Sequence, residues 1–542
     1  MVCTNHTAAA AADEAPDADT KEQSRSLSLS VPPTAVIPYS KEQLLALVDP
    51  DPYDPFSSAN AEDHFRFFRD PYMRNYAPDN GPELILARTR EDMDFPNHEQ
   101  VVVADPEEAE ILTDLRIAVL TRLRSPHKVD LDTIYEIYQR LPEPRIPYIY
   151  GRLRHYLLKA LGQPARKNTK SMLRYFAVIA DVKNNGIALT RAEWNCAISY
   201  ASRYVGVTTE VEAEAALKLW REMECEAGIK GTDVTFNILF DVASKAGNFP
   251  LAEMIYKEME SRGHRFNRYH FVSLIHFFGL KLDGTGIRAA YREMVDAGEI
   301  IDTVALNAVI SGLLRCGEET AAERVYERMK EAVRTSGSSN GSGSGSGSGS
   351  GDGDDDGGGG SSVMPARTYT TDRAITRALL MFAKIGRQYP DMRPTLQRNA
   401  PIHPDLHTYR ILVNHHAVIH GDLAKVAQYL DEMKLFHIPL HGAIFLALFK
   451  GFATHGGVPR SAWSAQRLFS IRDALVSALD DGVMGLEIKT WLVIWVLRAF
   501  ARCAVQEDVL DVYEDLKARW RLDDAEEQFM LDYLGQILVN AK

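Results

Sequence analysis

The stretch DVTFNILFDVASKAGNFPLAEMIYKEMESRGHRFN, residues 233–267, decides the fold. Its apolar residues recur at intervals of three and four in both halves: Phe236, Leu239, Phe240 and Ala243, then Ala252, Ile255, Tyr256 and Met259. Each half therefore predicts an amphipathic helix with one apolar face. Gly247 lies between them, where glycine can adopt the positive φ that ends a helix. We expect two short helices joined by a tight turn.

The same pattern returns after 35 residues. Three series keep this step: Asn237, Val272 and Asn307; Tyr256, Tyr291 and Tyr326; Met259, Met294 and Met329. A period shared by several residue types indicates tandem repeats, and units that cannot bury their apolar faces alone must stack on one another. The sequence thus predicts an all-α fold, an α-solenoid superhelix of tandem two-helix repeats.

Composition divides the chain into five regions. We expect an acidic, largely disordered or irregular N-terminal region (1–104) that packs partly on the first repeat, a first repeat array (105–334), a flexible Gly/Ser/Asp-rich linker (335–366), a second array (367–525) and a C-terminal helical cap or tail (526–542). Prolines break the second half of the unit 372–405.

The net charge of −13 is concentrated outside the repeats. Residues 1–100 contain 8 Lys and Arg against 18 Asp and Glu, so the repeats are nearly neutral. The segment 145–183 is basic, with nine Lys and Arg against one acid, Asp181. A basic surface there, continuous with a groove, would favour nucleic acid, whereas a solvated helical face is the plainer interpretation.

Motifs of catalysis and cofactor binding are missing from the sequence. It has no P-loop, nucleophile elbow or HExxH, and its apolar runs are too short for a membrane span. His416 and His420 are four residues apart, but no Cys or carboxylate completes a ligand set at a convincing spacing. We therefore expect no enzyme, no cofactor, no metal site and no small-molecule substrate.

The motifs VTFN at 234–237, KAG at 245–247 and YKEM at 256–259, followed by Gly263, resemble those of a pentatricopeptide repeat. The likeness is strong over 191–332 and clear over 406–440. The Trp-Leu-Gly-Tyr pattern of tetratricopeptide repeats is absent. Long loops between helices and a low-complexity insert resemble fungal mitochondrial members of the family.

This resemblance implies binding of single-stranded RNA, one base per repeat, along a concave groove. In the family the fifth and last residues of a repeat read the base edge, and the second residue packs on the base plane. The resemblance then assigns these residues to RNA binding: Asn195, Val234, Asn237, Asn267, Tyr269, Val272, Asp302, Val304 and Asn307. The pairing of Asn237 with Asn267 implies a pyrimidine, and Val272 cannot hydrogen-bond a base.

Assignments near the insert are less direct. Thr232 would be the last residue of the Asn195 unit, Thr376 and Asp405 would form a purine-type pair in the unit 372–405, and the last residue of the Asn307 unit would be lost in the insert. Arg410 occupies the fifth position of 406–440 and departs from the family pattern. A one-residue offset in that helix leaves the assignment open.

Two functions follow from the resemblance. The first is a mitochondrial RNA-binding factor that acts on the stability, processing or translation of an organellar transcript. The alternative is a protein-binding scaffold, such as an assembly factor for respiratory complex I or a mitoribosome-associated protein; the near-neutral repeats and acidic N-terminal region favour it. The mitochondrial location is implied by the family alone, because residues 1–35 lack the Arg-rich, acid-poor character of a presequence.

Overall fold

The computed structural model describes residues 39–48, 60–65, 105–125, 128–164, 168–202, 208–264, 266–338, 389–483, 486–520 and 524–540. Every regular element in these ranges is a helix. No helix among them is long and apolar enough to cross a membrane. The predicted all-α solenoid is therefore confirmed. The linker 335–366 and most of the N-terminal region fall largely outside the described residues.

The helices pair as antiparallel hairpins along the chain. The pairs are α4 (Pro106–Arg124) with α5 (Leu131–Gln139), α6 (Gly151–Leu161) with α7 (Thr169–Asn184), α8 (Arg191–Ala201) with α9 (Glu210–Arg221), α10 (Asp233–Lys245) with α11 (Phe249–Ser261), α12 (Arg268–Leu280) with α13 (Gly284–Asp296), α14 (Thr303–Arg315) with α15 (Glu319–Ser338), α18 (Leu406–Asn414) with α19 (Leu423–Leu435), α20 (Gly442–His455) with α21 (Ala465–Asp480), and α22 (Thr490–Cys503) with α23 (Gln506–Lys517). A last helix, α24 (Asp524–Asn540), packs on α22. Short π-helical turns extend two helices, η5 (Glu222–Glu226) after α9 and η7 (His415–His420) after α18.

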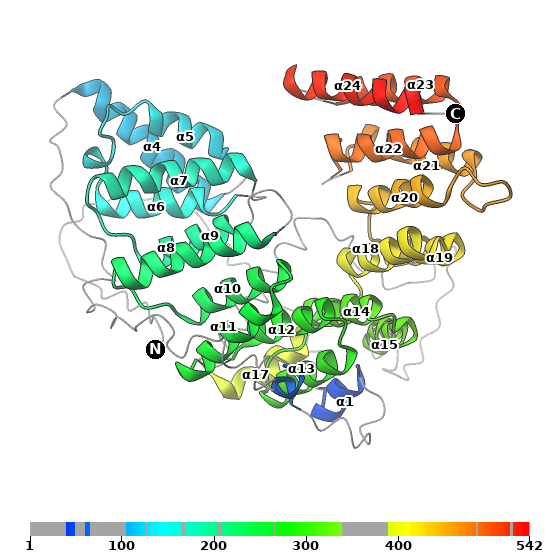
Figure 1. Ribbon diagram of the computed structural model, residues 1–542, viewed down its shortest axis with the longest axis horizontal. Coiled ribbons are helices and arrows are strands. Elements are labelled where there is room, and N and C mark those ends of the chain that lie inside the picture. Colours follow the sequence, from blue (N-terminus) through cyan, green and yellow to red (C-terminus); the bar gives the residue numbers. More distant parts are fainter. Residues whose placement is uncertain are drawn as a thin grey trace, which may run out of the picture.

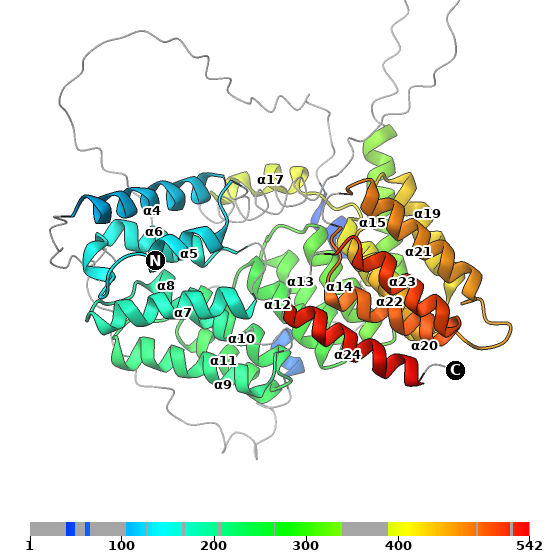
Figure 2. The same cartoon turned by 90° about the horizontal axis from the view of Figure 1, so that it is seen from above.

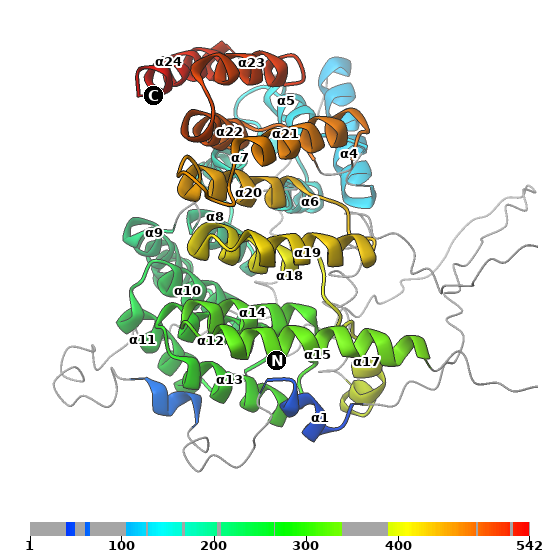
Figure 3. The ribbon, with the colours of Figure 1, turned by 90° about the vertical axis from the view of Figure 1, so that its right-hand side faces the viewer.

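The pairs stack into a U-shaped array (Figure 1). Helices α4 to α9 form one arm, α10 to α15 the bend, and α18 to α24 the other arm. Seen from above, the arms stand apart (Figure 2), and from the side the second arm is a stack of successive layers (Figure 3). The first helices of the pairs, such as α12, α14, α18 and α20, lie on the inner side, and each contacts the next.

The second helices supply the core, as their spacing predicts. Tyr256, Tyr291 and Tyr326 are buried, and so are Met259 and Met294. Burial of such large apolar side chains is the main favourable contribution to folding. The turn between α10 and α11 depends on Gly247 at φ 75°, a conformation that costs a residue with a Cβ.

The expectation of a repeat at 372–405 differs from the structure. Helix α14 contacts α18 directly, so the described part of 372–405 does not form a repeat between them. The described part of that unit, α17 (Arg393–Asn399) with its flanks, instead packs on the turn before α14, where the Gln397 side chain bonds the N–H and C=O of Ile301. The proline-rich stretch cannot continue a second helix, and Thr376 lies outside the described residues.

The N-terminal region also departs from expectation. Its described parts, α1 (Lys41–Ala46) and η2 (Ala61–His64), pack on α13 in the middle of the array rather than on the first repeat. Tyr291 donates a 2.8 Å hydrogen bond to the carbonyl of Leu44, and Phe65 is fully buried against Tyr256 and Phe278. Residues 39–48 and 60–65 are therefore part of the folded array.

Candidate functional site

The second residues of three neighbouring repeats form an exposed apolar line on α10, α12 and α14. Val234, Tyr269 and Val304 are 51%, 38% and 39% exposed although the fold offers each helix a buried face. They lie 35 residues apart in one register, each as the second residue of its helix. Exposed apolar side chains gathered in one register mark a surface that can bind a partner. We call Val234, Tyr269 and Val304 the position-two line.

The fifth residues connect each repeat to the third residue of the next. Asn195 accepts a 2.7 Å hydrogen bond from the Thr235 hydroxyl, and the carbonyl oxygen of Asn237 lies 3.1 Å from Nδ1 of His270. Both asparagines are half-buried. Among the described residues neither uses its amide nitrogen in a hydrogen bond, so each keeps a donor for a ligand.

His270 determines how the Asn237 amide is hydrogen-bonded. Full burial lowers the pKa of His270 to about 3, so the imidazole is neutral near pH 7. Phe266 stacks on the ring with centroids 4.1 Å apart. A neutral ring that donates from Nδ1 to the Asn237 oxygen leaves the amide N–H groups of Asn237 available as donors.

Asn307 and Val272 differ from these asparagines. Asn307 is buried, its amide nitrogen donates to Asp405 at 3.0 Å, and its oxygen accepts from Thr408 at 2.8 Å. Both ends of its amide are thus engaged within the protein. Val272 is half-buried and offers no polar side-chain atom.

The last residues of the repeats cap the next first helix. Asn267 is buried, accepts from the N–H groups of Tyr269 and His270, and donates to Asp233 at 3.1 Å. Asp302 is also buried, caps α14 through Ala305 and pairs with Arg268. Side-chain capping of this kind stabilises a helix start by about 1 kcal/mol. Both residues serve the fold in this state.

Asp405 belongs to the Asn307 repeat. It caps α18 as Asp302 caps α14, and it bonds Asn307 across the insert. The last residue of that repeat is therefore not lost in the insert, since Asp405 occupies this position. Sequence reasoning missed this because it counted along the chain, whereas the structure stacks the repeats on either side of the insert.

Sequence reasoning missed further residues at the second and fifth positions of the repeats. His155 is a fifth residue whose Nδ1 lies 3.1 Å from Glu193, the third residue of the next repeat. His407 and Trp491 are second residues, exposed on α18 and α22, and Trp491 is 54% exposed. Counting from each helix cap, here Asp405 and Lys489, would have found the last two.

Within the described residues of 145–183, several cations of the basic segment are paired with acidic side chains. Arg174 and Lys170 bind Asp132, and Lys183 binds Glu222. Arg154 is buried, and Arg145 is paired with Asp181. The remaining cations of the segment are either exposed one at a time or lie outside the described residues. Phosphate binding here would require some of these ion pairs to open.

Comparison with known proteins identifies the type of repeat. The family model for the PPR repeat matches residues 234–264 and 304–332, which contain the position-two line except Tyr269. A chloroplastic pentatricopeptide repeat-containing protein of Arabidopsis thaliana is 26% identical over 165 residues, 30% of this chain. The chain therefore contains pentatricopeptide repeats at residues 234–264 and 304–332, within a helical array of matching period. The aligned part is only 20% of the length of the Arabidopsis protein.

Solved structures of the pentatricopeptide repeat protein PPR10 also overlap with the array. PPR10 from maize is 16% identical, with a TM-score of 0.30 over 78% of this chain and 55% of that protein. PPR10 in complex with an 18-nucleotide psaJ RNA element is 13% identical, with a TM-score of 0.27 over 80% of this chain and 60% of PPR10. Overlap at this level adds nothing to the assignments that follow.

Proposed function

We propose that this protein binds single-stranded RNA along the inner first helices α8, α10, α12 and α14. The observation that carries the proposal is the alternation of two registers along these helices. An exposed second residue (Val234, Tyr269 or Val304) lies beside a fifth residue, and Asn195 and Asn237 keep a free amide donor. Flat apolar contact with a base and an amide donor for its edge are what RNA readout requires.

The repeats that begin with α10, α12 and α14 differ in the side chains that they present to a base. Asn237 combines with the exposed Val234, whereas the next repeat has Tyr269 for stacking but only Val272 at position five. Asn307 must exchange a bond to Asp405 or Thr408 before it can bind a base. Selectivity is therefore greatest at the Asn237 repeat and lowest at the Val272 repeat.

The proposed target is an organellar transcript, in the mitochondrion. Bound RNA is shielded from nucleases and from inhibitory pairing, so occupancy alone would alter transcript stability, processing or translation. No bond need be made or broken by the protein.

A protein-binding scaffold, for a respiratory-chain complex or the mitoribosome, is the second candidate. The pairing of Lys170, Arg174 and Lys183 with acidic neighbours favours it, because phosphates need available cations. The position-two line would then contact apolar side chains instead of bases.

Introducing negative charge on the position-two line separates these functions. The triple variant Val234→Asp/Tyr269→Asp/Val304→Asp places three carboxylates where RNA would lie, and like charges repel phosphate. We expect the Kd of the full chain for a pool of single-stranded RNA to rise at least tenfold. The matched control is Val211→Asp/Leu435→Asp/Leu510→Asp on outer helices, also exposed, which should leave the Kd unchanged.

The outcome also decides between partners. If the natural chain fails to retain any RNA from the pool, or if both triple variants bind equally, the RNA proposal is wrong. Co-purification of respiratory-complex or ribosomal proteins from mitochondria, lost only with the first triple variant, would establish the scaffold instead.

A further inference from the structure

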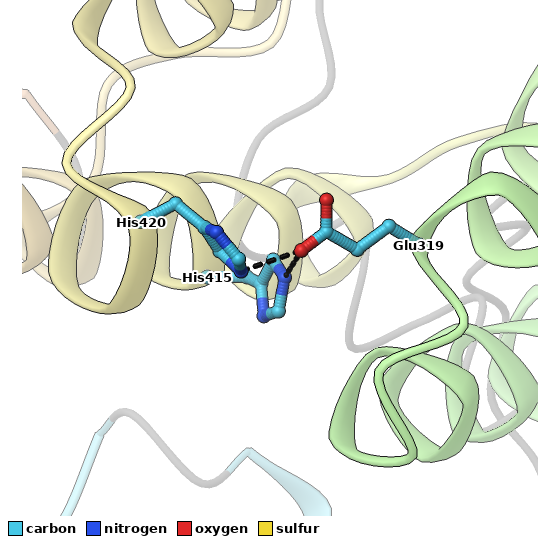
Figure 4. Close-up of side chains that lie close together, drawn as sticks. All are labelled: Glu319, His415 and His420. Atoms are coloured by element: carbon cyan, nitrogen blue, oxygen red, sulfur yellow. Dashed lines mark hydrogen bonds and ion pairs between the residues drawn. The ribbon is translucent and has the colours of Figure 1, made fainter.

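Two histidines and a glutamate meet at the joint between the repeats on either side of the insert (Figure 4). His415 and His420 come from η7, and Glu319 is the first residue of α15 in the preceding repeat. The Glu319 Oε1 atom lies 3.2 Å from Nε2 of His415 and 2.5 Å from Nε2 of His420. All three potential ligand atoms lie within 4.8 Å of one another.

The π-helical turn brings the two histidines together. Residues five apart on an α-helix point about 140° away from each other, whereas the wider π-turn reduces this angle substantially. The turn absorbs one extra residue: Gly247 follows the start of α10 by 14 positions, and Gly421 follows the start of α18 by 15. This is the one-residue offset in the sequence, and it lies after Arg410. The extra residue in the π-helical turn therefore brings His415 and His420 close together.

The fold does not require polar residues at this joint. The positions equivalent to Glu319 and His415 in an earlier joint are Phe249 and Phe277, whose rings pack edge to face at 5.7 Å. An apolar contact thus satisfies the same geometry elsewhere in the array. A carboxylate and two imidazoles in its place need another explanation.

We propose that Glu319, His415 and His420 form a binding site for a divalent transition-metal ion, with Zn²⁺ as the best fit. Two ligands that each lie about 2.0–2.1 Å from a tetrahedral Zn²⁺ ion are roughly 3.3 Å apart, close to the His415–Glu319 separation. His420 is 42% exposed and can move outward to reach that spacing. Imidazole ligands select Zn²⁺ and its neighbours over Mg²⁺ and Ca²⁺.

The surroundings suit metal binding. The His415 side chain is 8% exposed, so its ring is held in place by the surrounding protein. Lys425, on the neighbouring helix α19, is paired with Glu323 at 2.6 Å. His416 points elsewhere, with Nε2 3.5 Å from the Tyr429 hydroxyl. Three protein ligands leave a fourth position to water or to a ligand from a partner.

The site would strengthen the joint between two repeats that are far apart in the sequence. Helix α15 ends at Ser338 and α18 begins after Asp405, so side-chain contacts contribute to holding the repeats of α14 and α18 together. Asn307 and Asp405 connect them at the edge where first helices begin. Glu319, His415 and His420 connect them at the opposite edge, where a metal ion would add a bond between two repeats.

Metal titration of the full chain tests the proposal. After chelator treatment and its removal, we expect one Zn²⁺ per chain by calorimetry, and d–d absorption bands typical of nitrogen and oxygen ligands when Co²⁺ is added. Glu319→Gln and His420→Ala should each weaken Zn²⁺ binding at least tenfold. Both residues are partly exposed, so the variants should fold, which circular dichroism verifies.

The control is His437→Asn, at an exposed histidine with φ 53° that Asn can adopt, and it should bind Zn²⁺ like the natural chain. Absence of Co²⁺ bands and of Zn²⁺ binding in the natural chain would overturn the proposal. So would undiminished binding by folded His420→Ala.

Discussion

Asn307 and Asp405 are joined by a 3.0 Å hydrogen bond although 98 residues separate them in the chain. The bond closes a repeat whose first helix precedes the insert and whose last residue follows it. Asp405 caps α18 at the same time. The solenoid is therefore continuous in space where it is interrupted in sequence.

Removal of the Asn307 amide should weaken this joint. Asn307→Ala deletes two hydrogen bonds at a buried position and leaves the buried Thr408 hydroxyl without one of its partners. We expect the free energy of unfolding, measured in urea, to fall by roughly 1–3 kcal/mol. Asn184→Ala, at an exposed position on α7, is the control and should change it little. An unchanged value for Asn307→Ala would mean that the joint is held elsewhere.

Arg262 should be indispensable for stability. Its guanidinium and the Glu224 carboxylate are both 1% exposed and lie 2.6 Å apart. Arg262→Ala leaves a buried unpaired carboxylate, which costs about 3–5 kcal/mol of unfolding free energy. Lys434→Ala breaks an exposed pair with Asp431 and should cost at most about 1 kcal/mol. Equal effects of the two substitutions in urea denaturation would contradict this account.

His270 should make the array less stable in acid. Its pKa is about 3 in the folded protein and about 6.5 when unfolded, so between these values the unfolded chain binds more protons. Stability contributed by the neutral ring is then complete above pH 6.5 and is lost as the pH falls, by roughly 1.4 kcal/mol per unit. His270→Gln should remove that part of the slope in urea titrations from pH 7 to pH 4. An identical slope in the variant would show that His270 is protonated when folded.

Phe65 should hold the N-terminal region to the array. It is fully buried against Tyr256 and Phe278. Phe65→Ala should lower the free energy of unfolding by about 3–5 kcal/mol, because a large buried side chain is removed. Phe529→Ala on α24, where the ring is exposed, is the comparison and should have a small effect. If both are small, residues 60–65 are not part of the cooperative unit.

The sequence predicts the helices well because the residues that recur every 35 positions are also the ones that are buried or that form the turns. Tyr256, Met259 and Gly247 each lie where the 35-residue pattern places them. The fate of the fifth and last residues was harder to predict, because their hydrogen bonds depend on how repeats stack. Asn307 with Asp405, and Glu319 with His415, are 98 and 96 residues apart in the sequence and meet because the repeats on either side of the insert stack on each other. Nothing local in the sequence specifies that event.

The packing of the N-terminal region was unpredictable for the same reason. Phe65 and Leu44 form no periodic pattern, and their partners Tyr256 and Tyr291 are about 200 residues away or more. The expected contact with the first repeat rested on proximity in sequence alone. Long-range contacts of irregular segments follow from surface complementarity, which a single sequence does not display.

Photo-crosslinking of the full chain to 4-thiouridine-labelled single-stranded RNA, with mass-spectrometric mapping, tests the central claim most directly. We expect crosslinked peptides from α10, α12 and α14, at Val234, Tyr269, Val304 or their immediate neighbours. Crosslinks confined to the outer helices α11, α13 and α15, or their absence at saturating RNA, would contradict it.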